Sequence, residues 1–185
     1  MEFEILESKR LLLKGISPEG MTYIFENYSP SQIMYLLGHN TMEEFEKEKS
    51  KHEKGYATYN RSFILFLLID KETETIIGRC GLHNWNPDHN RAEIGYSMEV
   101  ESFKQLGLMS EAVEVILDYG FTILNLHRIE ALVASYNIPS LKLLNNNNFV
   151  QEGLLREHYL VGNKHEDSLV FSLLQKDYKG KKNLS

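Results

Sequence analysis

The segment FKQLGLMSEAV, residues 103–113, runs from a polar loop with a single glycine directly into an apolar-periodic helix. A helix that opens after a glycine presents unpaired backbone N–H groups and the positive end of its dipole, which together bind anions without a basic side chain. Lys104 is close enough in sequence to assist. A glycine at such a turn also serves ordinary turn geometry. The segment alone therefore leaves anion binding and simple turn formation both open.

Other residue patterns narrow the chemistry. The chain has neither GxxxxGK[ST] nor GxGxxG, which excludes the usual phosphate loop for nucleoside triphosphates and the dinucleotide fingerprint. Its seven histidines are scattered, with no HxxxH or CxxC spacing, so we expect no metal site. The one cysteine, Cys80, cannot form an internal disulfide, and its apolar surroundings favour a small buried side chain over a reactive thiol.

Length and composition indicate one folded unit. The chain has 185 residues, of which 42% are hydrophobic, and we expect a single domain over residues 1–178 with a frayed tail over 179–185. The net charge of -6 excludes a basic surface for nucleic acid and favours cationic substrates such as amines. The sequence shows no signal-peptide pattern and no run long enough to span a membrane, so we expect a cytoplasmic protein without membrane contact.

Strands and helices must position these residues. Ser17 and Pro18 supply an N-cap and a first-turn proline for one helix, and Thr41 with Glu44 forms a capping box for the next. Hydrophobic periodicity predicts an α/β (α+β) fold, a mixed sheet with helices on both sides. The predicted strands are 10–14, 63–70, 76–85, 91–100, 128–135, 148–160 and 166–178, and the predicted helices are 18–28, 41–55, 107–125 and 138–147.

The order of the later segments resembles the acetyl-CoA-binding half of the GCN5-related N-acetyltransferase (GNAT) family. The matching pieces are the strand AEIGYSMEV, the glycine turn with its helix, the strand RIEALVAS and the pair Asn137 and Ser140. The turn in that family reads roughly [Q/R]xxGx[G/A]. Lys104, Gly107 and Met109 occupy its marked positions, so only the glycine matches strictly, and a small residue is expected where Met109 stands.

The resemblance extends over nearly the whole chain and is strongest to the RimJ/RimL-like subgroup, which includes ribosomal-protein N-terminal acetyltransferases and relatives of spermidine acetyltransferase. Its further pieces are ESKRLLLK, IIGRCGLHNW and NFVQEGLLREHYLVGNKHEDSLVFSLL. The family usually has Gly before the Phe of a GF pair, whereas this chain has Asn148, the next-best residue for a left-handed helix end. The resemblance implies a mostly antiparallel sheet of about seven strands with a splayed pair.

The resemblance also implies acetyl-CoA as cosubstrate. Backbone groups near residues 98–100 would pair with the pantetheine arm, and N–H groups of residues 105–110 would hold the pyrophosphate. The implied cofactor-binding residues are Met98, Glu99, Val100, Lys104, Gln105, Leu106, Gly107, Leu108, Met109, Ser110, Asn137 and Ser140. Asn137 and Ser140 also suit the start of a helix, so capping is an alternative role for both.

The implied reaction is direct attack of a primary amine on the thioester. The family's usual tyrosine acid falls on Leu144, so Ser140 is the candidate acid, as in RimL-like enzymes. Glu93 is the first candidate base, and its alternative is an outward ion pair with Arg91 or Arg128. His158 is the second candidate base, and a shift of one position would select Glu157 instead.

The acceptor is expected to be a protein N-terminal α-amine or a small amino compound. His83 and Trp85, in the turn-rich stretch 83–90, are candidates to line its pocket, with packing as the alternative role of Trp85. Because Leu144 cannot donate a proton, a catalytically weak acetyl-CoA-binding module that acts as a sensor or binds a partner protein is the alternative function. The sequence is compatible with a homodimer but does not require one.

Overall fold

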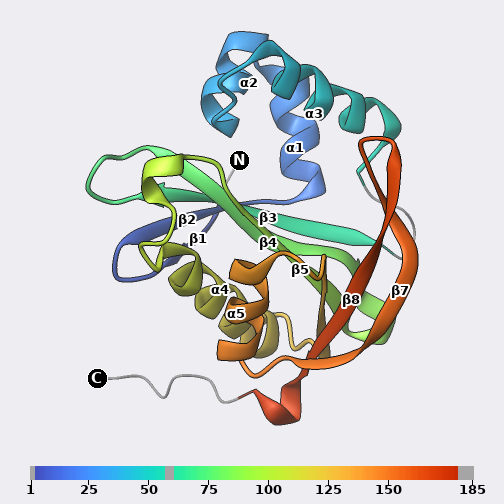
Figure 1. Ribbon diagram of the computed structural model, residues 1–185. Helices are drawn as coiled ribbons and strands as arrows, with labels where there is room; N and C mark the ends of the chain where they lie inside the picture. Colours follow the sequence, from blue (N-terminus) through green and yellow to red (C-terminus); the bar gives the residue numbers. More distant parts are fainter. Residues whose placement is uncertain (1–2, 57–60, 179–185) are drawn as a thin grey trace.

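The computed structural model describes residues 3–56 and 61–178 (Figure 1). It contains one eight-stranded sheet in the order β1-β2-β3-β4-β5-β6-β8-β7, in which β5 and β6 are parallel and the other neighbours antiparallel. The strands are β1 (Glu4–Glu7), β2 (Leu11–Ile16), β3 (Ser62–Asp70), β4 (Ile76–Asn86), β5 (Arg91–Met98), β6 (Arg128–Val133), β7 (Val150–Val161) and β8 (Lys164–Leu174). The predicted fold class is confirmed, with eight strands in place of about seven. The predicted tail 179–185 lies outside the described residues.

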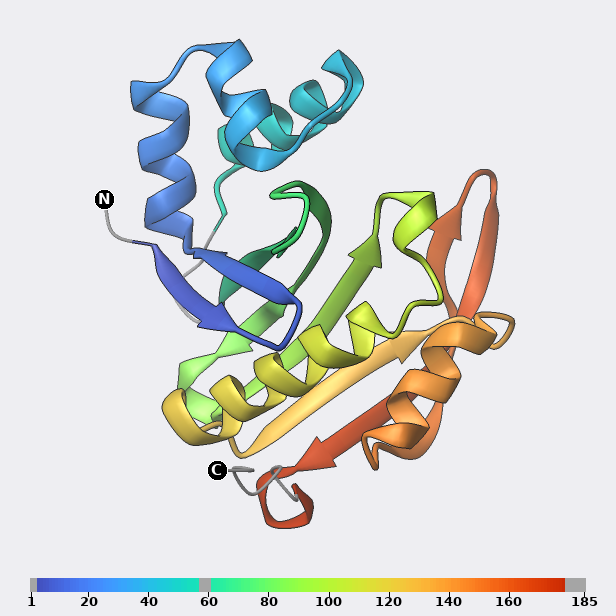
Figure 2. The same ribbon diagram turned by 90° about the vertical axis from the view of Figure 1, so that its left-hand side faces the viewer.

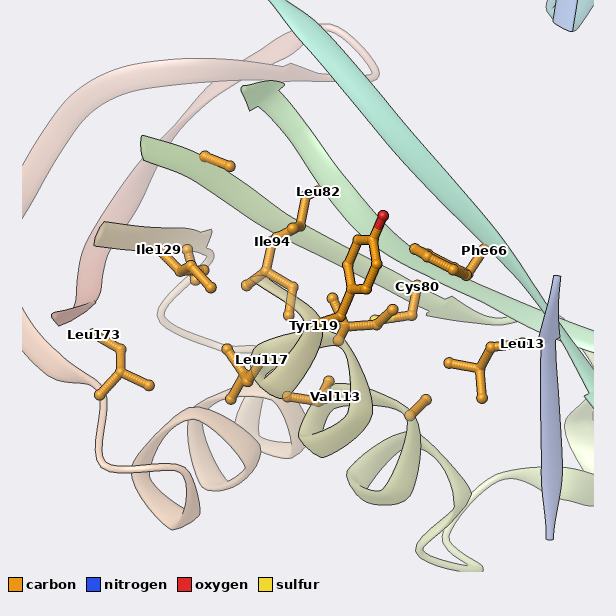
Figure 3. Packing of buried hydrophobic residues seen from close by; sticks show 14 of the residues in the cluster. Leu13, Phe66, Cys80, Leu82, Ile94, Val113, Leu117, Tyr119, Ile129 and Leu173 are labelled. Atoms are coloured by element: carbon orange, nitrogen blue, oxygen red, sulfur yellow. The ribbon is translucent and has the colours of Figure 1, made fainter. Parts of the chain in front are cut away.

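Helices cover both faces of the sheet (Figures 1 and 2). They are α1 (Pro18–Asn27), α2 (Pro30–Leu37), α3 (Met42–Lys54), α4 (Leu108–Asp118) and α5 (Ile138–Asn146). Side chains alternate between the two faces along β3. Phe66 packs in the core beneath α4, where its ring meets Tyr119 at 5.5 Å between centroids (Figure 3). Leu67, in contrast, packs with Met21 of α1 on the other face. Cys80 is fully buried in the core beneath α4, as predicted.

Some elements differ from the predictions. The capping box of α3 is present, with Glu44 N–H bonded to Thr41 at 3.2 Å. Neither β1 nor α2 was predicted, although Ser29 and Pro30 begin α2 with the same signals that begin α1. The predicted helix over 107–125 is shorter, because α4 ends at Asp118 and a π-helical turn, Tyr119–Ile123, follows.

The feature that positions the site is the parting of β5 from β6. The two strands pair only from Arg91–Glu93 to Arg128–Glu130. Beyond these pairs the strands diverge, and α4 begins beside the gap (Figure 2). The splayed pair that the resemblance implied is therefore present, and it leaves backbone hydrogen-bonding groups of both strands without a sheet partner at this point.

Candidate active site

The glycine turn before α4 has the geometry that an anion site requires. Gly107 is the N-cap of α4 in the left-handed conformation, with φ of 79°, and Gln105 also has a positive φ of 61°. The first bond of the helix runs from Glu111 N–H to the Gly107 carbonyl at 3.2 Å. The N–H groups of residues 108–110 precede that bond, so they have no acceptor within the helix. The turn therefore offers backbone donors at the positive end of the helix dipole.

The turn is held in place by the N-terminal part of the chain. The Arg10 guanidinium donates to Glu111 of α4 at 2.7 Å and to the Leu106 carbonyl at 2.9 Å. Lys104, the cation expected to assist anion binding, pairs with Glu101. Because this pairing offsets the Lys104 charge, the donors that the turn offers are chiefly backbone N–H groups.

A cavity of about 740 Å³ lies between this turn, the end of β5 and the start of α5. It brings together most of the predicted cofactor-binding residues, namely Met98, Lys104, Gln105, Gly107, Leu108, Met109, Ser110, Asn137 and Ser140. Met109 lines this cavity and also packs against the core beneath α4. We name this cavity the cofactor cleft.

Three predicted cofactor-binding residues lie outside the lining of the cofactor cleft. The N–H groups of Glu99 and Val100 donate to the Ile77 carbonyl, at 2.9 and 3.3 Å. The carboxylate of Glu99 forms an ion pair with Arg79 at 2.9 Å. The carbonyl of Leu106 accepts from Arg10, and its side chain is exposed. Their roles toward a cofactor stay predictions.

Asn137 and Ser140 begin α5, and the capping role is present. The Asn137 Oδ1 atom accepts from Ser140 N–H at 3.2 Å. The Ser140 hydroxyl is not used in this cap, and the Ser140 side chain lies close enough to Tyr96 on β5 to lower the pKa of the phenol. Burial raises the pKa of Tyr96 more than Ser140 lowers it, so the phenol keeps its proton at neutral pH. Tyr96 was not among the predicted site residues.

A smaller cavity of about 270 Å³, the reaction chamber, lies where β5 and β6 part. Glu93 and Ser140, the first candidate base and the candidate acid, both line it. Leu144, at the position of the family tyrosine, lines it as well and is buried. The reaction chamber shares Tyr96, Asn137 and Ser140 with the cofactor cleft.

Glu93 is held by two neighbours on β4. Its Oε1 atom lies 3.2 Å from His83 Nε2, and its Oε2 atom accepts from the Asn84 amide at 2.9 Å. Burial raises the pKa of this carboxyl, but the His83 and Asn84 hydrogen bonds and the charges of His83 and His158 outweigh burial and hold the pKa below its usual value. Glu93 is therefore ionised at neutral pH.

The alternative ion pairs of Glu93 are not formed. Arg91 and Arg128 both pair with Glu130, at 3.3 and 2.8 Å. Glu130 lies beside Glu93 in the parallel register of β5 and β6. Glu130 therefore balances the charge of these two arginines, and Glu93 has His83 and Asn84 as its partners.

His83 reaches Glu93 because residue 95 is a glycine. A Cβ atom at Gly95 would lie 2.8 Å from His83 Cε1, closer than real Cβ atoms approach a neighbour. The imidazole therefore lies directly against the β5 backbone. His83 fell both in the predicted strand 76–85 and in the predicted turn-rich stretch 83–90. The strand β4 continues through Asn86 and places His83 opposite Glu93 in register.

The second candidate base, His158, lies beside the reaction chamber. Its Nδ1 atom is 3.1 Å from the Ser168 hydroxyl, and its charge contributes to lowering the pKa of Glu93. The next residue, Tyr159, lines the chamber. Glu157 has a left-handed φ of 50°, and its N–H donates to Asp167 at 2.8 Å.

A third cavity of about 540 Å³ lies between helices α1 and α3 and strands β3, β4 and β5. It shares His83, Gly95 and Tyr96 with the reaction chamber. Tyr96 thus lines all three cavities. We name this third cavity the acceptor pocket.

Two features are absent from residues 3–56 and 61–178. No cluster of three or more His, Cys, Asp or Glu side chains there has an arrangement that would hold a metal ion. No helix in the same residues is long and apolar enough to cross a membrane.

The chain is similar to acetyltransferases along most of its length. The family model of the acetyltransferase (GNAT) domain matches residues 10–150. The uncharacterized N-acetyltransferase YoaA of Bacillus subtilis is 32% identical over 174 residues, which cover 94% of this chain and 98% of that protein. The uncharacterized N-acetyltransferase p20 of Bacillus licheniformis is 46% identical over 115 residues, which cover 62% of this chain and 64%, slightly under two thirds, of that protein.

Named enzymes are among the more distant similarities. The spermidine N(1)-acetyltransferase of Vibrio cholerae is 29% identical over 172 residues, covering 92% of this chain and 96% of that protein. The crystal structure of ribosomal-protein-S5-alanine acetyltransferase from Vibrio fischeri superposes with a TM-score of 0.65 at 22% identity, covering 95% of this chain and 99% of that one, and shows a shared fold. Since the family model matches well over half of the chain, the protein belongs to the GNAT family of N-acetyltransferases, as the sequence resemblance predicted.

Proposed function

We propose that the protein transfers the acetyl group of acetyl-CoA to a primary amine by direct attack in the reaction chamber. The observation that carries this proposal is that Glu93 and Ser140 line one small cavity, which shares Tyr96 with the cofactor cleft and with the acceptor pocket. The amine is a protein N-terminal α-amine or the amine of a small amino compound. We further propose that residues 1–178 form one domain.

The cofactor cleft fits acetyl-CoA by the chemistry of its donors. Unpaired N–H groups at the start of α4 suit the pyrophosphate, and unpaired backbone on the parting strands suits the amides of the pantetheine arm. When bound, acetyl-CoA supplies the activated acetyl group as a thioester. Asn137, at the start of α5, lines both the cleft and the chamber and is placed to position the arm.

In this proposal Glu93, together with His83, is the general base. The amine must lose a proton before or during attack on the acetyl carbon, and an ionised carboxylate beside an imidazole receives and passes on that proton. Glu93 also attracts the incoming ammonium form by its charge. His158 remains the second candidate base, because it lies beside the chamber and influences Glu93.

Ser140 is the proposed acid for the leaving sulfur. With acetyl-CoA bound, the Ser140 hydroxyl would donate a proton to the departing sulfur and would regain one from water. This role replaces the tyrosine that family members place where Leu144 stands.

Acetyl-CoA turnover with a panel of amines and N-terminal peptides tests the function. We expect release of CoA with at least one primary amine. Stabilisation of the protein by CoA without turnover of any acceptor contradicts the proposal and favours a binding module. The base is assigned by pH-rate profiles of His158→Ala. Loss of the acidic limb in this variant identifies His158 as the base, whereas a profile that His158→Ala leaves intact supports Glu93 with His83.

A further inference from the structure

The side chains that line the acceptor pocket favour some amine acceptors over others, although the acetyl transfer itself requires only an amine. The volume of about 540 Å³ is that of a site for a small organic group. Most of its walls are apolar or aromatic. The side chains of this kind in the lining are Met21, Tyr56, Phe63, Ile64, Leu65, Leu82 and Tyr96.

The lining of the acceptor pocket contains more cationic than anionic side chains. Among the described residues of the lining, Glu48 is the one carboxylate, and Lys51 and Arg79 are cations. The Glu48 side chain is only 7% exposed. It already accepts from Lys51 at 2.9 Å and from the Tyr56 hydroxyl at 3.2 Å. Its charge is therefore balanced before any acceptor enters.

A second positive charge on the acceptor would be unfavourable in this pocket. An ammonium taken from water into an apolar pocket needs a carboxylate of its own. Here it would compete with Lys51 for Glu48 and would lie near the Arg79 guanidinium, which Glu99 balances at 2.9 Å. An apolar or aromatic group, in contrast, has no charge to desolvate, and the burial of its apolar surface favours binding.

We infer that the acceptor is a monoamine whose body is apolar or aromatic and carries no second positive charge. This inference rests on the proposed acetyl transfer. It separates the protein from an enzyme for polyamines, even though one similar protein is named a spermidine acetyltransferase. Two sources share this chemistry, namely a small apolar amine and a peptide N-terminus with an apolar first side chain.

A matched pair of acceptors tests the inference. Hexylamine and 1,6-diaminohexane have the same chain and differ by one ammonium. We expect kcat/KM for hexylamine to exceed that for the diamine by about tenfold. Peptides that begin with Leu or with Lys make the same comparison for the second source, and preference for the Leu peptide over the Lys peptide supports the inference for a peptide acceptor.

A variant of the pocket charge completes the test. Lys51→Gln removes a cation and frees Glu48 for a second ammonium, so the preference for hexylamine should fall about threefold or more. Lys49→Gln, on the same helix and outside the pocket lining, is the matched control and should keep the wild-type ratio.

The outcomes separate the inference from the proposed function. Equal or better turnover of the diamine and of the Lys peptide overturns the inference while the acetyl transfer stands. The inference is also overturned if the ratio of kcat/KM for hexylamine to that for 1,6-diaminohexane is the same in wild type, Lys51→Gln and Lys49→Gln. The charge of the pocket then does not select the acceptor. Binding of CoA without turnover of any amine overturns the proposed function, and the inference with it.

Discussion

His83 Nε2 lies 3.2 Å from Oε1 of Glu93, across the antiparallel pair β4 and β5, at the level where β5 begins to part from β6. The carboxylate is nine-tenths buried, yet its hydrogen bonds keep it ionised. A buried charge that is retained in this way has a cost in stability, which is characteristic of groups that do chemistry.

Replacement of Glu93 by Gln should lower kcat/KM about a hundredfold, because the amide neither receives the proton of the amine nor attracts its ammonium form. Steady-state turnover with the best acceptor measures the effect. Glu130→Gln is the matched control, since Glu130 is the register partner of Glu93 on β6 and lies outside the chamber lining. Comparable activity in wild type and Glu93→Gln would eliminate the carboxylate as base.

The hydroxyls of Ser140 and Tyr96 should act as a unit. We expect Ser140→Ala and Tyr96→Phe each to lower kcat about tenfold with little change in the KM for acetyl-CoA, and the double variant to lose less than the product of the single effects. Tyr119→Phe, a buried tyrosine of the core, controls for loss of a hydroxyl. An unchanged kcat in Ser140→Ala rejects the acid role.

Gly107→Ala should weaken CoA binding. At φ of 79° an alanine is strained by about 1 kcal/mol, and a Cβ there would meet only the tip of Arg10 at 3.6 Å, so the effect is on backbone conformation. Gly162→Ala, at φ of 61° in the turn between β7 and β8, carries the same strain away from the cleft. Thermal unfolding should show similar losses in both variants. Calorimetry should show weaker CoA binding in Gly107→Ala alone, and equal binding in the two variants would contradict the role of this turn.

Glu152 should contribute stability that depends on pH. The Arg128 guanidinium, which donates two hydrogen bonds to this carboxylate at 2.5 and 2.9 Å, and the Ser172 hydroxyl lower the pKa of Glu152 to about 2 from an ordinary value of 4.5. Because the folded-state pKa is depressed, the contribution is fully present above pH 4.5 and is lost as the pH falls toward 2. The side chain is 42% exposed, so screening keeps the contribution below about 1 kcal/mol.

Urea unfolding of Glu152→Gln measures this contribution. The variant should be less stable than wild type at pH 6, and the difference should shrink at pH 2 and in high salt. Glu46→Gln, an exposed change on α3, is the control. A difference between Glu152→Gln and wild type that stays the same from pH 6 to pH 2 would show that the ion pair is not its source.

Local signals allowed much of the scaffold to be predicted. The capping box of Thr41 and Glu44, the left-handed Gly107 and the left-handed Asn148, with φ of 61°, each depend on a few neighbouring residues, and all are present. The helix α2 was missed despite its start signal, because its eight residues span little more than two turns of periodicity.

Contacts within the site depend on register, which the sequence does not encode locally. His83 lies opposite Glu93 only for one alignment of β4 with β5, and that alignment is irregular between His83 and Asn86. A shift by one residue would turn His83 to the other face. Tyr96 was missed for the same reason, since it meets Ser140 only because β5 and β6 part.

The strand β7 ends the sheet, and all twelve of its residues are exposed. A long open edge with apolar side chains such as Leu154, Leu155 and Leu160 invites a strand from another molecule and hence aggregation. The register of β7 breaks between Leu155 and Tyr159, where Glu157 adopts a left-handed conformation. This break, with a second one between Gln151 and Gly153, divides the edge into three short runs, and the charged Arg156 and Glu157 lie within the longer break. Such interruptions disfavour fibre-like stacking.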